Sequence, residues 1–269
     1  MKIAKQGMEM EDRVKPLEGV RNFRDFGGYA TPNGVIRPGL LFRSGHYNEA
    51  TDKDVAFLDS LGVSYHIDLR RPDERDRQPN RWPAEHVEQI SHEGGREEVP
   101  AHIAALQGDN VTPESIEGYM TKYYRAAPFK EHHIALFRAW FDGLAREGGE
   151  GAAVVHCAAG KDRTGIICAL THIVLGVDEK DVAEDYILTN EAVDIDRFLP
   201  EARKRFNEAL GANHEADVYR PFMGVRDVYL ENAFEVMSDA HGSPRNYARE
   251  VLGVDDEMGD RLKKRFLQT

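Results

Sequence analysis

The most constraining feature of this sequence is an apolar run, AAVV at 152–155, that leads directly into HCAAGKDRTG at 156–165. The segment that follows, 164–175, is apolar on almost every side. A short apolar run predicts a buried strand, and a longer segment that is apolar all round predicts a buried helix. The sequence therefore predicts a strand, a tight loop and a helix in immediate succession.

Strand and helix patterns alternate along the first two thirds of the chain. Short strands joined by turns are indicated at 26–45, further strands at 63–69 and 87–90, and helices at 51–62, 112–123 and 129–145. Residues 91–112 are typical of a loop or a short helix, and helical patterns follow at 178–191, 194–210, 225–241, 243–252 and 255–266. This order predicts an α/β fold with a mainly parallel central sheet flanked by helices and a helical C-terminal half.

One domain spanning 1–269 is expected, because the sequence has no internal repeat, low-complexity tract or long linker. A formal net charge of −12 argues against nucleic acid and anionic membranes as partners. The longest uncharged stretch, 164–177, is shorter than the roughly 20 residues of a transmembrane helix. We expect a cytoplasmic protein, with export without a cleaved signal peptide as the alternative, and the sequence leaves the oligomeric state open.

The ten-residue motif is more specific than its cysteine and arginine alone. With two cysteines in the chain, a cysteine followed six positions later by an arginine would arise by chance in roughly a fifth of such sequences. Requiring a hydroxyl residue next, and glycine at Gly160 and Gly165, lowers this expectation to roughly one in ten thousand.

The predicted loop at a helix N-terminus suits a tetrahedral anion, because its backbone N–H groups converge and the helix dipole adds positive charge. Arg163 can grip two phosphate oxygens, and the same field favours the thiolate of Cys157 as a nucleophile that forms a phosphocysteine. Thr164 is expected to donate its hydroxyl to the sulfur, and His156 to orient the loop. The predicted phosphate-binding residues are Ala158, Ala159, Gly160, Lys161, Asp162 and Arg163.

The remaining cysteine and a histidine pair have simpler interpretations. Cys168 lies in the apolar helix and is expected to fill the core, with a redox partnership with Cys157 as the alternative. His132 and His133 lie in a helical stretch without matching ligands and are expected to be surface or packing residues. No CxxC or paired Cys/His spacing indicates a metal, so neither a metal nor another cofactor is expected.

HCAAGKDRTG resembles the signature loop of the cysteine-dependent protein tyrosine phosphatases. Its Lys161-Asp162 pair is similar to the pair found in a bacterial branch of that family, which includes a secreted mycobacterial member. Further similar blocks are NFRDFGGY, RPGLLFRSG, IDLR, YMTKYYR, EDYILTNE and MGVRDVYL. The resemblance implies a metal-independent phosphatase acting on phosphotyrosine, with extension to phosphoserine, phosphothreonine and phosphoinositides, and a helical lid at about 194–220. Lys161 would suit substrates with additional phosphates.

The leaving oxygen needs a proton, which a carboxylic acid most naturally supplies. Related phosphatases place an aspartate before the cysteine, where this sequence has only Glu131, or after the second strand, where it has Glu93. Asp162 is therefore the first candidate for the general acid, Glu93 the second and Asp68 the third. The alternative role for Asp162 is to tie down the loop by bonding Lys161 or backbone amides.

The NFRDFGG segment contains two neighbouring residues of opposite charge. Arg24 and Asp25 are expected to form a buried pair, with Arg24 near the pocket floor as the alternative.

A sulfur transferase is the nearest rival enzyme, because its loop also surrounds a cysteine with an anion-binding cradle. A phosphate-binding module without turnover is the third class. A nucleotide kinase is excluded, because Gly160-Lys161 lacks the upstream glycine and the following Ser or Thr.

Overall fold

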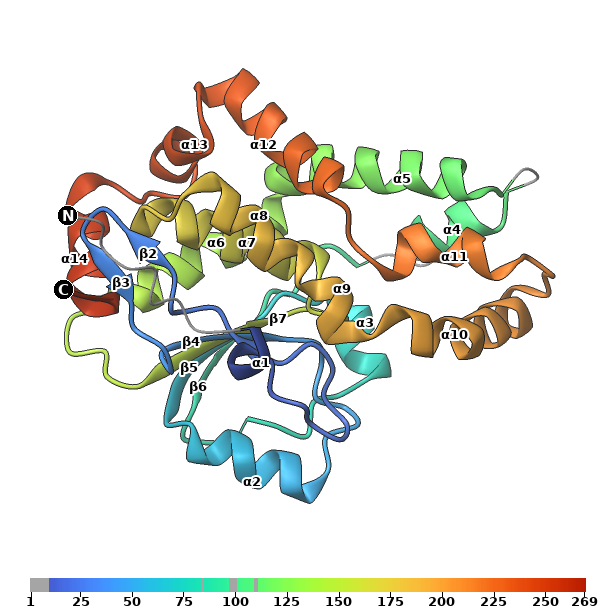
Figure 1. The fold of residues 1–269 in the computed structure, drawn as a ribbon, viewed down its shortest axis with the longest axis horizontal. Coiled ribbons are helices and arrows are strands. Elements are labelled where there is room, and N and C mark those ends of the chain that lie inside the picture. The colour runs from blue at the N-terminus through green and yellow to red at the C-terminus, as the bar shows by residue number, and fades with distance from the viewer. Residues whose placement is uncertain (1–9, 84, 97–100, 109–110) are drawn as a thin grey trace.

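A computed structural model describes residues 10–83, 85–96, 101–108 and 111–269. A five-stranded sheet lies at its centre in the order β1-β4-β7-β5-β6, with helices on both faces (Figure 1). The strands are β1 (Arg24–Asp25), β4 (Leu41–Ser44), β7 (Ala152–His156), β5 (Val63–Asp68) and β6 (Glu88–Ile90). All pair in parallel except β1, which is antiparallel to β4. The predicted α/β fold with a mainly parallel central sheet is confirmed.

The helices carry most of the chain. Those before the central strand are α1 (Met10–Arg13), α2 (Asp52–Ser60), α3 (Pro72–Arg77), α4 (Ala101–Leu106), α5 (Pro113–Ala126), a 3-10 turn (Ala127–Phe129) and α6 (Glu131–Leu144). Those after it are α7 (Asp162–Leu175), α8 (Glu179–Ile187), α9 (Thr189–Val193), α10 (Ile195–Leu210), α11 (Ala216–Met223), α12 (Asp227–His241), α13 (Pro244–Glu250) and α14 (Asp256–Phe266). The expected helical C-terminal half is confirmed.

The local sequence explains the elements that position the loop. Every residue of β7 is buried, as a strand in the middle of a parallel sheet requires. α7 is buried along almost its whole length and lies on the face of the sheet opposite α2 (Figure 1). α2 begins with a capping box, in which Thr51 and Asp54 each accept a hydrogen bond from the backbone N–H of the other.

Several elements differ from the sequence-based expectation. α3 was not predicted, and neither was β8 (Leu267–Gln268), which joins β2 (Ala30–Thr31) and β3 (Gly34–Ile36) in a second sheet. The helix expected at 178–191 is divided into α8 and α9, where the Thr189 hydroxyl accepts a hydrogen bond from buried Arg24. Within 91–112, α4 forms, while residues 97–100 and 109–110 lie outside the described residues.

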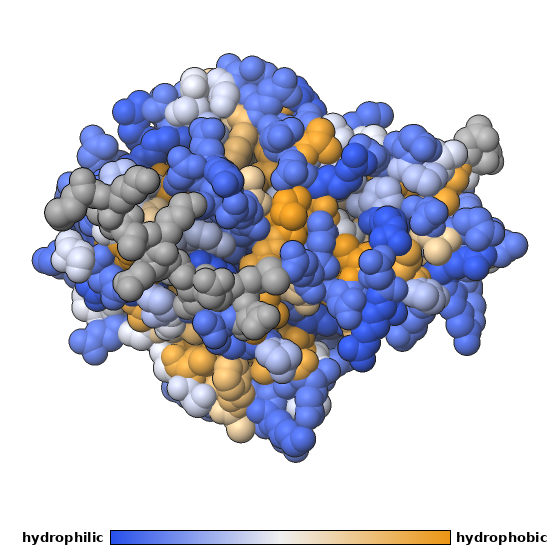
Figure 2. All heavy atoms as spheres, in the orientation of Figure 1, coloured by the Kyte–Doolittle hydropathy of each residue, from blue (hydrophilic) through white to orange (hydrophobic). Residues whose placement is uncertain are grey.

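The segment expected to be a lid, 194–220, forms α10 and much of α11. Together with α4 and α5 these helices extend from one end of the sheet (Figure 1). They share a small apolar cluster whose buried members are Leu106, Ile116, Leu199, Val218 and Tyr219. On the face drawn in Figure 2, apolar side chains gather in the middle and polar ones cover most of the rest. In the described ranges, no helix is both long and apolar enough to cross a bilayer.

Candidate active site

The motif begins at His156, where β7 ends, and α7 starts within it at Asp162. Gly160 has φ +69°, and a side chain there would place its Cβ 2.3 Å from the backbone of Ser44 on β4. At Gly165 a Cβ would lie 2.9 Å from the ring of Tyr186 on α8. Both glycines of the motif are therefore required by close approach, and Gly160 also by its left-handed backbone.

The carbonyl groups of the loop are held by donors outside it. His156 Nδ1 bonds the Cys157 carbonyl at 3.0 Å, and the His46 N–H donates to the Ala158 carbonyl at 3.1 Å. Because the two ends of a trans peptide point in opposite directions, the N–H groups of Ala158 and Ala159 are directed away from these partners. This orientation leaves them available to an anion, as the sequence predicts for a phosphate cradle.

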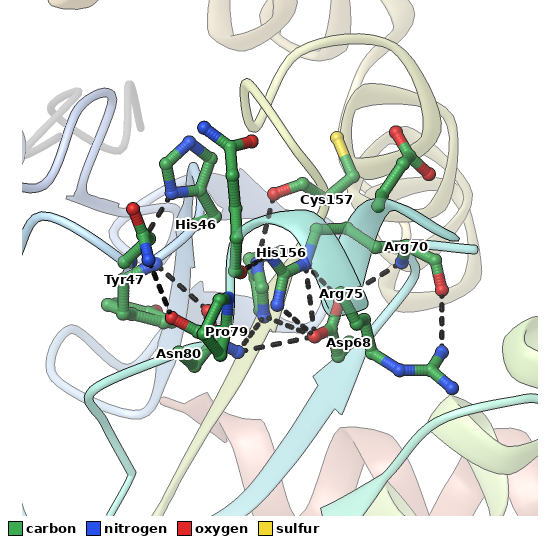
Figure 3. Close-up of polar contacts among 12 residues, drawn as sticks. His46, Tyr47, Asp68, Arg70, Arg75, Pro79, Asn80, His156 and Cys157 are labelled. Carbon is green, nitrogen blue, oxygen red and sulfur yellow. Dashed lines mark hydrogen bonds and ion pairs between the residues drawn. The ribbon is translucent and has the colours of Figure 1, made fainter. Parts of the chain in front are cut away.

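A buried polar network lies beneath the loop (Figure 3). Asp68 forms a bidentate pair with Arg70 and lies 3.4 Å from His156 Nε2, and Asn80 bonds both Asp68 and His156. Burial alone would raise the pKa of Asp68, but His156 and Arg70 hold it well below its usual range. The sulfur of Cys157 points away from this network in Figure 3, so Asp68 supports the loop from below.

Arg163 is nearly buried and holds a bidentate ion pair with Glu74 of α3. Its Nη1 and Nη2 lie 2.6 and 2.8 Å from the two carboxylate oxygens, and Nη1 also donates to the Leu69 carbonyl. Burial alone would lower the pKa of Arg163, but Glu74 raises it well above its usual range. Burial would likewise raise the pKa of Glu74, but Arg163 and Arg71 bring it below its usual range. The guanidinium is thus charged and fixed in orientation.

Sequence reasoning missed Glu74, although a local signal for it exists. RPDE at 71–74 places Pro72 at the first position of α3 and Glu74 at its third, directly after β5. Glu74 Oε2 accepts a hydrogen bond from the Arg71 N–H at 2.8 Å, which completes half of a helix cap. The cap fixes the carboxylate locally, whereas its pairing with Arg163 depends on the tertiary fold.

Asp162 and Lys161 lie side by side at the start of α7. Asp162 Oδ1 accepts a hydrogen bond from the Tyr124 hydroxyl at 2.8 Å, and the Tyr186 hydroxyl donates to that of Tyr124 at 2.7 Å. Lys161 is 4% exposed, its Nζ lies 3.5 Å from Asp162 Oδ2, and it donates to the carbonyls of Phe222 and Gly224. The lysine therefore links the loop to the end of α11.

A pocket opens above Cys157. Its base includes Cys157 and the loop residues Ala158, Ala159, Lys161, Asp162 and Arg163. Its walls come from α3, α5, α11 and the start of α6, with Tyr119, Tyr123 and Phe222 supplying aromatic rings. His132 and His133 also line it, a position that the sequence did not indicate. Burial, Lys130 and Arg163 lower the pKa of His132 to about 4, so this imidazole is neutral at pH 7.

Three other residues singled out by the sequence, Thr164, Cys168 and Glu93, lie in different environments. The Thr164 hydroxyl is buried without a hydrogen-bond partner among the described residues, so the expected bond to the Cys157 sulfur is not formed. Cys168 is buried in the main core, and burial raises the pKa of its thiol to about 12. Glu93 has an exposed side chain paired with Arg75 and does not line the pocket.

The expected pairing of Arg24 with Asp25 is wrong. Asp25 instead accepts hydrogen bonds from the N–H groups of Gly27 and Gly39, where it fixes a turn. Arg24 lies near Asp185 of α8, which also bonds Arg43 at 2.8 Å. Burial alone would raise the pKa of Asp185, but these two arginines lower it to about 2.

No cluster of three or more His, Cys, Asp and Glu side chains that could hold a metal occurs in the part of the chain that the structure describes. The two cysteines are both buried and free of disulfide bonds.

Comparisons with known proteins identify the family of the chain. The Cupriavidus necator protein H16_A0669, whose name assigns it to the tyrosine-protein phosphatases, is 28% identical over 89% of this chain and 84% of its own. The triple specificity protein phosphatase PtpB of Mycobacterium tuberculosis is 28% identical over 93% and 98%. The solved structure of TpbA from P. aeruginosa is 18% identical, covering 71% of this chain and 90% of its own, with a TM-score of 0.30. The sequence model of the tyrosine phosphatase family matches residues 15–268, so this chain belongs to that family.

Proposed function

We propose that this chain hydrolyses phosphomonoesters through a phosphocysteine formed on Cys157, without a metal. The observation that carries the proposal is the pocket in which Cys157 and Arg163 lie together at the junction of β7 and α7. The positive helix N-terminus, the inward N–H groups and the guanidinium favour both a phosphate dianion and a thiolate at this place.

The reaction has two stages. The Cys157 thiolate attacks phosphorus, the Sγ–P bond forms, and the P–O bond to the leaving group breaks as that oxygen takes a proton from Asp162. Water then attacks phosphorus, its proton passes to the Asp162 carboxylate, and the Sγ–P bond breaks to release inorganic phosphate. Arg163 binds the equatorial oxygens in both stages, and rotation of the orphan Thr164 hydroxyl toward the sulfur would ease the second.

Asp162 remains the first choice among the candidate acids. It lines the pocket, and the bond from the Tyr124 hydroxyl to one carboxylate oxygen holds the side chain in place there. Glu93 is exposed and Asp68 is held below the loop by Arg70, which makes both less suited to this role. The structural alternative for Asp162, a tie to Lys161, stays open because the two side chains are 3.5 Å apart.

The proposed substrates are phosphotyrosine proteins, with phosphoserine, phosphothreonine and phosphoinositides as extensions. PtpB is named a triple specificity phosphatase, and the aromatic wall of Tyr119, Tyr123 and Phe222 would pack against a phenol ring. Lys161 adds a second cation for further phosphates. We also propose that α10 and α11 act as a lid, since Phe222 of α11 lines the pocket, and that the protein acts in the cytoplasm.

The first test concerns Cys157. We expect the protein to hydrolyse an aryl phosphate in the presence of EDTA, to be inhibited by vanadate, and to lose activity by about 10⁴-fold or more in Cys157→Ser. Cys168→Ser is the matched control, because its thiol is also buried but lies in the core, and it should retain activity. Transfer of sulfur from thiosulfate to cyanide, without phosphate release, would instead establish the rival sulfur transferase.

The second test concerns the proton donor. Asp162→Asn should lose the basic limb of the pH–rate profile with an aryl phosphate whose leaving group is poor, and kcat should fall by about 10²-fold. With a very good leaving group the loss should be smaller, because that group needs no proton. Glu93→Gln provides the control and should keep the profile of the unchanged protein. An unaltered profile in Asp162→Asn would reject the acid role.

A further inference from the structure

Asn22 has an unusual backbone for a buried residue. It is 2% exposed and has φ +59°, and among the described residues only Asp194 shares a positive φ without being glycine. Asparagine tolerates this region better than most residues, yet the conformation still costs free energy relative to an extended one. Such strain persists where the surroundings require it, and an observed outlier near a site points to a role there.

The side chain of Asn22 shows what holds this conformation. Its Nδ2 donates to the carbonyl of Ala159 at 3.1 Å and to that of Gly160 at 2.8 Å, so both amide hydrogens are used on the loop. Its Oδ1 accepts a hydrogen bond from Arg24 Nη1, and this fixes which end of the amide faces the loop.

A second donor acts on the same part of the loop. Arg43 Nη2 donates to the Gly160 carbonyl at 3.1 Å. Both Arg24 and Arg43 are buried against Asp185, and Arg24 also donates to the Asp185 carbonyl and the Thr189 hydroxyl. The amide of Asn22 is therefore anchored through Arg24 to α8 and the start of α9, while Arg43 joins the Gly160 carbonyl to the same aspartate.

The planar peptide bond explains how these contacts orient the loop. With the carbonyls of Ala159 and Gly160 bound on the Asn22 side, the N–H groups of Gly160 and Lys161 point away from Asn22. Ala159 and Lys161, on either side of Gly160, line the pocket. We propose that Asn22 is a positioning residue for the phosphate cradle, holding these two amides toward the anion. This inference rests on the proposed phosphatase chemistry. Asn22 does not line the pocket, so it acts through the loop.

Two substitutions separate this role from simple stability. Asn22→Asp keeps the size of the side chain but removes both donors and turns an oxygen toward two carbonyl oxygens. Asn22→Gly removes the amide, while glycine adopts a positive φ without strain, so the backbone itself is favoured. Asn232→Asp is the matched control, because Asn232 also donates Nδ2 to a carbonyl and accepts from an arginine, but on α12 outside the pocket.

For both Asn22 variants we expect kcat to fall by about 10- to 100-fold and the inhibition constant of vanadate to rise by a similar factor. KM should change less, because substrate is also held by Arg163 and the aromatic walls. Asn232→Asp should match the unchanged protein in kcat and vanadate inhibition. A folded Asn22→Gly protein with unchanged kcat and unchanged vanadate inhibition would overturn the inference.

A measurement on the unchanged protein covers the case in which the variants do not fold. The ¹⁵N–¹H signals of Gly160 and Lys161 should shift on addition of vanadate, since their N–H groups would then donate to its oxygens. Unshifted signals at saturating vanadate would overturn the role of Asn22 alone. Activity that survives in Cys157→Ser would instead overturn the proposed function on which it rests.

Discussion

At the scale of single residues, Arg163 would be shared between its partner Glu74 and the proposed substrate. Glu74 takes the edge of the Arg163 guanidinium formed by Nη1 and Nη2, and no hydrogen bond of the described residues uses Nε. Glu74 therefore has two opposing effects. It orients the guanidinium for an incoming phosphate, and its negative charge weakens the attraction of the site for any anion.

These two effects make Glu74→Gln informative. The variant loses the charge and one acceptor, so Arg163 becomes more attractive to anions but less well oriented. We expect kcat to fall by about tenfold or more, because the transition state requires the geometry, while inhibition by inorganic phosphate stays equal or becomes stronger. Steady-state kinetics with phosphate as a competitive inhibitor measures both quantities.

Asp76→Asn is the control for Glu74→Gln, since Asp76 lies on the same helix but pairs with Arg96 on the surface. It should leave kcat and phosphate inhibition as they are. If kcat were retained in Glu74→Gln, Arg163 would need no partner to hold it, and the positioning role would be wrong.

At the scale of elements, the proposed lid meets the loop through one side chain. Lys161 donates to the carbonyls of Phe222 and Gly224 at the end of α11, where those groups have no partner within the helix. A bound phosphate would compete for the same ammonium. Occupancy of the pocket and attachment of α11 are therefore opposed.

Limited trypsin digestion measures this competition. Vanadate should accelerate cleavage within 195–223 by about tenfold, the equivalent of one lost charge-assisted hydrogen bond. In Lys161→Met, cleavage should already be fast and vanadate should not change it, whereas Lys180→Met, which removes an exposed lysine on α8, should behave as the unchanged protein. Equal cleavage of the unchanged protein with and without vanadate would count against a lid.

The elements also show how far sequence alone reaches. β7, the loop and α7 could be predicted because an apolar strand, glycines and an apolar helix leave local patterns at 152–175. Pairings between distant segments leave no local pattern in the sequence. The sequence predicts that Arg24 pairs with its neighbour Asp25, although its partner Asp185 is about 160 positions away. β8 is too short to show a period, and it forms only because β3 offers an edge.

At the scale of the whole molecule, three carboxylates with lowered pKa values support the site. Asp68, Glu74 and Asp185 each hold buried arginines, and together they tie the loop to α3 and α8. A carboxylate whose pKa is lower in the folded state stabilises the fold above its unfolded pKa, and this stabilisation is lost as pH falls toward the folded pKa. For Asp185, the change from 3.8 to about 2 corresponds to about 2 kcal/mol.

The net charge of −12 acts in the opposite direction, since protonation relieves self-repulsion as pH falls from 7. Self-repulsion is screened by salt, but buried pairs are screened much less. In 0.5 M NaCl we therefore expect the free energy of unfolding in urea to fall as pH drops below about 6.5, because His132 and His46, whose folded pKa values are about 4, take up protons on unfolding. It should fall by several further kcal/mol from about pH 5 to 2, where the paired carboxylates take up protons on unfolding. Glu93→Gln, which removes an exposed pair, should follow the same curve, and Glu74→Gln should lose less, having one fewer carboxylate to protonate. A fold equally stable at pH 3 and pH 7 would mean that these pairs do not support the site energetically, and that the apolar core alone keeps the loop at 156–165 in place.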